Sequence, residues 1–349
     1  METEGAVARA VAALDRATAL LDRGLAEPYR VRAFLRARPV VLALTDAELC
    51  GRVATKTVTD LPGIGASIAA LVEDAVEDRP SAYLEKLDAE TAVVSSPQGA
   101  VLRNALQGDL HVHTDWSDGG ASISEMARAA AGLGHSYLAV TDHSGRLTVA
   151  KGLDRSRLGR QLEEHRAVRT RVSDEFGIRL VTGVEVDINE DGSLDGDDDV
   201  LAELDVVVAS VHVKMGMTKD LMTHRLLLAV TNPNVDILGH CTGRKVTGRG
   251  RSEMQADWDL VFAACARYGT AVELNCRPER LDPPRRLMAR AAEIGCLFAI
   301  NSDAHAPGQL EWQPLGCNRA AEVGIEPDRV INTWDWDRLS EWAGGHLAV

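Results

Sequence analysis

The sequence of 349 residues has few features of membrane, secreted or disulfide-rich proteins. No run approaches about 18 uninterrupted apolar residues, so no transmembrane helix is predicted. The first residues, METEGAVARAVAALDRATALL, lack the basic start and unbroken apolar core of a signal peptide. The six cysteines are scattered without a CxxC pair, which favours reduced core thiols and a cytoplasmic location.

The sequence is also short of positive charge. Its formal net charge of −14 argues against broad nucleic-acid binding. The balance is uneven, however, because residues 23–56 hold seven Arg or Lys and three acids, whereas residues 185–205 hold ten acids and no base. We therefore expect a basic patch in the first part of the chain, with Arg30 and Arg32 as candidate DNA contacts.

Residues 1–91 are expected to form a small all-α domain. Apolar residues recur at helical spacing over 6–23, and further helices are expected at 28–37, 46–54, 65–78 and 80–88. No strand pattern appears before about residue 108. The segment AVVSSPQGAV at 92–101 contains a Ser-Ser-Pro breaker, so residues 92–107 are predicted to be a linker.

Residues 108–349 have a different sequence pattern, which is typical of an α/β fold. Seven short β-rich runs alternate with helical patterns, which indicates a parallel sheet with both faces covered. Seven such units suit a closed barrel better than an open doubly wound sheet, and no Gly-rich phosphate loop follows the first run. The runs are DLHVH (109–113), YLAVT (137–141), IRLVTGVEV (178–186), VVVASVHV (206–213), VDILGH (235–240), TAVELN (270–275) and CLFAIN (296–301).

Residues able to bind metals gather where these runs end. In GDLHVHTDWSDGG, residues 108–120, His111 and His113 are i and i+2 on a strand and share one face, and a Gly-rich turn can return Asp118 towards them. A lone histidine at a strand end is usually structural. Here six of the ten histidines follow predicted strands, whereas His135, His165, His224 and His346 do not. The nine candidate ligands are His111, His113, Asp118, His143, Glu185, His212, His240, Asp303 and His305.

Imidazole and carboxylate ligands suit Zn²⁺, Mn²⁺ or Fe²⁺, and nine are too many for one ion, so two to three ions are expected. Such ions activate water and neutralise phosphate oxygens, which points to phosphate-ester hydrolysis. Lys214, Arg244 and Arg277 follow strand ends and are candidates for contacting the substrate phosphate; solvated or salt-bridged surface charges are the alternative. Asp142 either orients His143 or caps its strand.

Six motifs together resemble those of the polymerase-and-histidinol-phosphatase (PHP) superfamily: HVHTDWSDG, AVTDHS, GVEVDI, ASVHVKM, LGHCTGR and INSDAHAP. The resemblance covers about residues 108–340 and is greatest to the C-terminal PHP domain of bacterial family X DNA polymerases. It implies a distorted seven-stranded (β/α)7 TIM-like barrel with a trinuclear site. His111, His113, Glu185 and Asp303 would hold one metal, Glu185 would bridge to a second metal on His212 and His240, and Asp118, His143 and His305 would hold the third.

The segment TDLPGIGASIAALVEDAV, residues 59–76, has the form of a helix-hairpin-helix. Gly63 and Gly65 would let the backbone approach a DNA phosphate at a helix N-terminus, although a purely structural hairpin has the same pattern. With AEPYRVRAFLRARPV, 26–40, it resembles the N-terminal domain of family X polymerases. The lyase lysine of some members falls at Leu71, so lyase activity is not expected. No polymerase region separates the two parts, so polymerase activity is not expected either.

Three functions follow from this pattern. The first is a metal-dependent phosphoesterase acting on DNA 3′ ends, as a 3′-5′ exonuclease or 3′-phosphatase in DNA repair, with Glu185 and Asp303 as central site residues. The second is a small-molecule phosphatase of the histidinol-phosphate or nucleotide type, which the acidic segment 185–205 favours. The third is a non-catalytic DNA-binding protein. The sequence leaves the metal, the natural substrate and the oligomeric state open.

Overall fold

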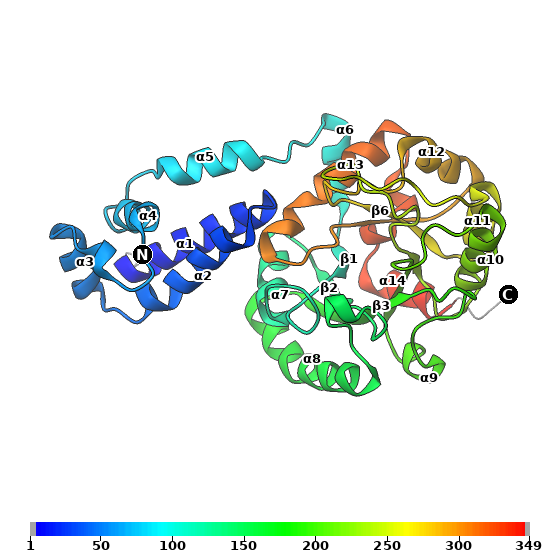
Figure 1. The fold of residues 1–349 in the computed structure, drawn as a ribbon, viewed down its shortest axis with the longest axis horizontal. Coiled ribbons are helices and arrows are strands. Elements are labelled where there is room, and N and C mark those ends of the chain that lie inside the picture. The colour runs from blue at the N-terminus through cyan, green and yellow to red at the C-terminus, as the bar shows by residue number, and fades with distance from the viewer. Residues whose placement is uncertain (1–4, 346–349) are drawn as a thin grey trace. The chain divides into compact units, whose positions relative to one another are not determined.

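The computed structural model describes residues 5–345, and the chain divides into two compact units between Ala92 and Val93. The first unit is entirely helical, as predicted. Its core includes Leu14 and Leu21 from the first helix, Leu49 from the third and Leu71 from the fourth. The helices are α1 (Ala6–Arg23), α2 (Pro28–Leu42), α3 (Asp46–Ala54), the short η1 (Val58–Asp60), α4 (Ala66–Val76) and α5 (Ala82–Thr91) (Figure 1).

The predicted linker differs from the structure, because residues 97–105 form helix α6 (Pro97–Ala105), which packs against α13 (Gln313–Glu322) in the second unit. Ser96 caps α6 by accepting a hydrogen bond from Gly99 N–H. The Asn318 amide then accepts from Ser96 N–H at 2.8 Å and donates to the Val94 carbonyl at 2.7 Å. The Ser-Ser-Pro sequence predicts a break, but it starts a helix, because Ser is favoured at the N-cap and Pro at the first helical position.

The second unit is a barrel of seven parallel strands that pair in chain order, which confirms the predicted fold class and excludes the open doubly wound sheet. The first and last strands meet through a bridge between Val112 and Ala304 and a hydrogen bond from His113 N–H to the Ala304 carbonyl at 2.8 Å. The strands are β1 (Gly108–Val112), β2 (Tyr137–Val140), β3 (Arg179–Asp187), β4 (Val206–Ser210), β5 (Ile237–Leu238), β6 (Ala271–Asn275) and β7 (Phe298–Asn301).

Helices surround these strands on the outside (Figure 1). They pack on the outward faces of the strands through an apolar cluster that includes Val184, Val207 and Phe262. The principal helices are α7 (Ile123–Gly132), α8 (Arg155–Phe176), α10 (Lys219–Val230), α11 (Trp258–Tyr268), α12 (Arg285–Ile294) and α13. Shorter elements are η2 (Thr148–Ala150), α9 (Asp198–Leu201), η3 (Pro307–Trp312), η4 (Pro327–Arg329), η5 (Ile331–Thr333) and α14 (Trp336–Ala343).

The side chains that point into the barrel change from apolar to polar along the strands. Because side chains at i and i+2 share a face, Val181 and Glu185 lie on the same inward face of β3. Val181 belongs to an apolar cluster at the N-terminal end of the barrel, together with Val208, Ala299 and Trp334. The residues further along the same faces are polar. The strands therefore close one end with a dry core and present their functional groups at the other end.

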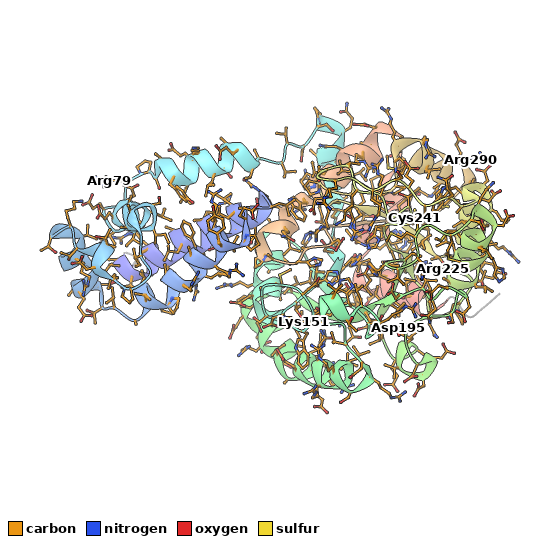
Figure 2. All side chains as sticks on the ribbon, in the orientation of Figure 1. Arg79, Lys151, Asp195, Arg225, Cys241 and Arg290 are labelled. Carbon is orange, nitrogen blue, oxygen red and sulfur yellow. The ribbon has the colours of Figure 1, made fainter. Side chains whose placement is uncertain are left out.

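Buried Arg225 on α10 fixes two of the loops at this polar end, and Figure 2 labels its position in the barrel. Its guanidinium donates to the carbonyl of Ile188, after β3, and to that of Val213, after β4, at 3.1 Å. The six cysteines are all free, and only Cys50 is exposed. Within residues 5–345, no helix combines the length and the apolar character needed to cross a bilayer.

We predict that Asn318→Ala lowers the free energy of unfolding of the barrel unit by about 1–2 kcal/mol, because two hydrogen bonds to the α6 segment are lost. All six tryptophans follow residue 92, so tryptophan fluorescence during urea unfolding reports on this unit alone. Asn104→Ala, on the exposed face of α6, is the matched control and should have little effect. Equal midpoints for the two variants would show that α6 contributes no stability.

Candidate metal centre

The buried carboxylate of Glu185, near the end of β3, lies at the middle of the polar end of the barrel. Its two oxygens face different histidines. Oε2 lies 2.7 Å from His143 Nδ1, 3.5 Å from His111 Nε2 and 3.7 Å from His113 Nε2. Oε1 lies 2.9 Å from His240 Nε2 and 3.4 Å from His212 Nε2. One side chain therefore contacts imidazoles from the ends of four other strands.

A second group lies on the other side of His113 and His143. Asp118 Oδ1 is 3.4 Å from His305 Nε2 and 3.6 Å from His143 Nε2. Asp303 Oδ1 lies 3.3 Å from His113 Nε2. The structure thus brings together all nine residues that the sequence singled out as ligands. Three overlapping sets have the spacing of a metal site: His113, Asp118, His143 and His305; His111, His113 and Glu185; and His143, Glu185 and His212.

The hydrogen-bonding of these groups fits metal ligation. Buried polar atoms are almost always hydrogen-bonded. Here His111 Nε2, His212 Nε2, Glu185 Oε2 and both ring nitrogens of His113 are buried without a hydrogen-bond partner. These orphaned lone pairs converge from several strands, and imidazole and carboxylate are the donors that Zn²⁺, Mn²⁺ and Fe²⁺ accept. The residues present therefore fit a site for several divalent transition-metal ions.

Local charge favours the protonation states that ligation needs at Glu185 and His113. At His111 and His212 burial opposes protonation, but the neighbouring carboxylates raise the pKa of both rings, that of His212 to about 9. Burial opposes ionisation of Glu185, but the rings of His212 and His111 hold the pKa of this carboxyl well below its ordinary value. Burial, reinforced by His305 and His143, holds the pKa of His113 well below its usual range. Glu185 is therefore ionised and His113 is neutral at pH 7.

Two buried carboxylates that the sequence analysis missed support the histidines. Glu273, on β6, lies 2.6 Å from His111 Nδ1 and accepts from the His240 backbone N–H at 2.7 Å. Asp187, the last residue of β3, lies 3.0 Å from His212 Nδ1 and accepts from the His212 backbone N–H at 3.1 Å. A carboxylate on the far nitrogen fixes the orientation and tautomer of a ligating imidazole. The available signal was spacing, because Glu273 lies two residues before Asn275 at the end of β6 and Asp187 lies two residues after Glu185 on β3.

Asp142 organises the loop after β1 rather than the ring of His143. It accepts from the Thr114 backbone N–H at 2.8 Å and from the Thr114 hydroxyl at 2.6 Å, and it also contacts Ser117 and Gln161. Gly119 lies where a Cβ would come within 2.7 Å of the His113 carbonyl oxygen, so the turn needs glycine. This turn carries Asp118 back over the barrel mouth.

The three candidate phosphate-binding cations lie in different settings. Arg277 is the one that reaches the ligands, since Nη1 is 2.9 Å from His305 Nδ1 and donates to the Asp303 carbonyl at 3.1 Å. Arg244 donates to the carbonyls of Arg280 and Leu281, which fixes a loop. Lys214 is exposed and adopts φ 54°. The sequence analysis missed Arg280, whose Nε lies 3.3 Å from Asp303 Oδ2.

The remaining candidates are placed as follows. Gly63 adopts φ 75° in the turn before α4, and Gly65 is the N-cap of that helix; both are exposed. Arg30 and Arg32 are exposed on α2. Leu71, at the position of the lyase lysine in the resemblance, is fully buried. Of the other histidines, His135 and His165 are buried, His224 is exposed and His346 lies outside the described residues.

Residues 109–277 match the family model for the PHP domain, and they include seven of the nine convergent side chains. The chain carries a PHP domain. The match ends before Asp303 and His305, which the fold nevertheless brings into the same cluster.

Individual relatives each match about two thirds of the chain. A protein of Bacillus subtilis (strain 168) named DNA polymerase/3'-5' exonuclease PolX is 41% identical over 227 residues, which are 65% of this chain and 39% of that protein. A protein of Thermoanaerobacter sp. (strain X514), named a probable phosphatase, is 29% identical over 249 residues, which are 67% of this chain and 93% of the relative. The chain thus spans well under half of the first relative. A solved structure of histidinol phosphate phosphatase from Lactococcus lactis, with zinc, L-histidinol and phosphate, aligns with 63% of this chain and 94% of that chain at a TM-score of 0.44 and 18% identity.

We predict that the purified protein holds about two to three transition-metal ions per chain and that Glu185→Gln lowers this number and reduces turnover by about 100-fold or more. The amide is a poorer ligand than the carboxylate, while the side chain keeps its shape and polarity. Metal content is measured by elemental analysis, and folding is checked by circular dichroism. Full occupancy with near-normal turnover would contradict the central role of Glu185.

Proposed function

We propose that this PHP domain hydrolyses phosphate esters at DNA 3′ ends, as a 3′-5′ exonuclease or a 3′-phosphatase, with DNA presented by the helical domain of residues 1–91. In this proposal residues 108–349 are the catalytic domain. The observation that carries the DNA-end specificity is the 41% identity to a relative whose name includes a 3′-5′ exonuclease. The exposed turn around Gly63 and Gly65 supports it independently.

The ligands divide into three sets around Glu185. We assign His111, His113, Glu185 and Asp303 to one ion, Glu185, His212 and His240 to a second, and Asp118, His143 and His305 to a third. The support is the orientation of Glu185, because Oε2 faces His111, His113 and, at 2.7 Å, His143, while Oε1 faces His212 and His240. A carboxylate with that orientation is suited to bridging two cations.

Bound divalent ions supply Lewis-acid stabilisation of the phosphate and lower the pKa of a water molecule. The residues of this chain hold and orient the ligands and complete the charge. Arg277 is placed to contact a phosphate oxygen as it contacts His305, and its side chain is largely buried, so the contact is made in a setting of low dielectric. No side-chain nucleophile is required.

The turn before α4 has the properties of a phosphate-backbone contact. Leu61 and Ile64 anchor it in the helical core, while Gly63, Gly65 and Ser67 are exposed. The first N–H groups of a helix have no partner within the helix and can donate to an anion. Built on Gly65, a Cβ would meet no atom within 4 Å, so a side chain there would project into the space that a phosphate needs.

A small-molecule phosphatase is the second candidate. The supporting observation is that 93% of the Thermoanaerobacter relative, named a probable phosphatase, aligns with this chain. The test is a turnover screen of the Mn²⁺ and Zn²⁺ forms on 3′-recessed DNA, 3′-phosphorylated DNA, mononucleotides and histidinol phosphate. A preference for either DNA substrate supports the first proposal. A preference for a soluble monoester supports the second.

We predict that Gly65→Val lowers kcat/KM on 3′-recessed DNA by about tenfold and leaves the hydrolysis of p-nitrophenyl phosphate within about twofold. Gly65 has an ordinary negative φ, so valine blocks a phosphate without straining the backbone. The matched control is Gly51→Val on α3, which is also exposed and open. If Gly65→Val and Gly51→Val degrade DNA at the same rate, the turn does not present DNA.

The exposed cations of α2 are expected to act in the same way. The double variant Arg30→Ala and Arg32→Ala should weaken DNA hydrolysis and make it less dependent on salt, because phosphate contacts release counterions. The measurement is kcat/KM on DNA between about 50 and 200 mM salt. An unchanged salt slope would remove these two residues from the DNA-binding surface.

A further inference from the structure

A cationic ribbon follows β5, the strand that leads to His240. Residues 243–251 read GRKVTGRGR, so four cations occur within nine residues of a chain whose net charge is −14. Lys245, Arg249 and Arg251 are exposed, and Arg244 is half-buried. Arg244 is the one residue of this segment that the sequence marked as a candidate.

The ribbon has a defined structure. Lys245 N–H donates to the Arg251 carbonyl at 3.0 Å, and Arg251 N–H donates to the Lys245 carbonyl at 2.9 Å. Gly248 and Gly250 adopt φ 66° and 63°, which permits the tight reversal between them. Lys245 and Arg251 are therefore directly opposite each other, and side chains of such a pair lie on the same face. A hollow of about 400 Å³ is lined by Lys245 and Arg251 together with Arg244 and Ser252.

The cations of this hollow lack the carboxylate partners that other arginines of the barrel have. Within residues 5–345, no Asp or Glu oxygen lies within 4.0 Å of the charged groups of Arg244, Lys245 or Arg251. By contrast, Arg290, labelled in Figure 2, pairs with Asp259 at 2.7 Å. The one carboxylate in the hollow, Glu253, pairs with Arg286.

The charges around this hollow affect the pKa of Lys245. Burial and the nearby charges of Arg280 and Arg251 lower the pKa of Lys245, against the opposing charge of Glu279. Cations that repel one another in this way are stabilised by an incoming anion. The ribbon is therefore a built, electropositive surface rather than a set of independently solvated charges.

This surface is continuous with the metal centre. Val246 N–H donates to the Glu279 carbonyl at 2.7 Å, and Arg244 Nε donates to the Arg280 carbonyl at 3.1 Å, so the ribbon is fixed to the loop after β6. In that loop Arg280 contacts Asp303 and Arg277 contacts His305. A row of cations thus runs from the metal ligands to Lys245 and Arg251.

We propose that the ribbon of residues 243–251 binds the phosphodiester backbone of the polynucleotide strand whose end enters the metal centre. This inference rests on the proposed phosphoesterase function and adds to it a substrate class: an ester with further phosphates along a chain. A small phosphomonoester reaches the metal ligands and Arg277 but not Lys245 or Arg251. The barrel itself, and not only the helical domain, then distinguishes a polymer from a monoester.

The test is the double variant Lys245→Ala and Arg251→Ala in the full chain. Its matched control is Arg267→Ala and Arg338→Ala, which removes the same charge from the opposite end of the barrel. Arg267 is in the last turn of α11, and Arg338 packs on Trp334, whose carbonyl accepts from the hydroxyl of Tyr137 at the start of β2. We expect kcat/KM on 3′-recessed DNA to fall about tenfold in the ribbon variant only, with a shallower salt slope. Turnover of p-nitrophenyl phosphate should stay within about twofold of the unmodified chain.

The single variant Lys245→Glu controls for a local folding defect, because the Lys245 side chain makes no hydrogen bond or ion pair that would be lost among the described residues. This variant should reproduce the fall in kcat/KM on DNA. Ribbon variants that cleave DNA with the rate and salt slope of the unmodified chain would overturn the inference. The binding of a fluorescent single-stranded oligonucleotide, measured by anisotropy, separates the two proposals. An unmodified chain that hydrolyses none of the esters refutes the proposed function, whereas weaker binding in the ribbon variants alone still supports the surface.

Discussion

The two oxygens of Glu185 face different groups of imidazoles, and the rest of the functional end of the barrel is arranged around this buried anion. An isolated carboxylate in a protein interior is strongly disfavoured. Here the rings of His143 and His240 lie within 2.9 Å of it, and those of His111 and His212 within 3.5 Å. The charge is tolerable only because groups that stabilise an anion reach it from several strands. The same arrangement leaves donor lone pairs directed at common points, which is the requirement for holding cations.

The position of the Glu185 carboxylate depends on β3, the strand that carries it. Two residues before Glu185 on the inward face, Gly183 lies where a Cβ would come within 2.7 Å of the Val206 carbonyl oxygen. Any side chain there would push β3 away from β4 and move Glu185 with it. Glu273 and Asp187 then fix the imidazoles through one repeated device, in which a buried carboxylate binds both a ring nitrogen and a backbone N–H of a ligand strand. Ligand positions are thereby set by the backbone of the barrel and not by the side chains alone.

The sequence predicted the barrel and the convergence of nine side chains because both follow from local rules. Strand periodicity places His111 and His113 together, and parallel strands end at a common edge. What it missed depends on contacts between distant residues. Glu273 and Arg280 act on residues contributed by other strands, and the one local signal was the i, i+2 spacing of Glu273 and Asn275. The run VDILGH was predicted as a full strand, yet β5 is only Ile237–Leu238, because the chain turns at His240, where φ is 23°. Helix α6 likewise depends on Asn318, more than 200 residues away.

The structure changes the interpretation of the acidic segment, because it shows what each of its carboxylates contacts. The acidic segment 185–205 favoured a small-molecule substrate when considered as a sequence. In the structure Glu185 and Asp187 are buried parts of the metal centre, while Asp197 and Asp199 pair with Arg155 at 2.7 Å. Asp195, labelled in Figure 2, accepts from the Arg146 backbone N–H. Much of this negative charge is thus neutralised or committed locally. By contrast, Arg244, Lys245 and Arg251 have no carboxylate partner among the described residues, and Arg277 and Arg280 contact His305 and Asp303. The net charge of −14 therefore does not describe the field that a substrate meets at the mouth of the barrel, and a polyanionic strand remains compatible with an acidic protein.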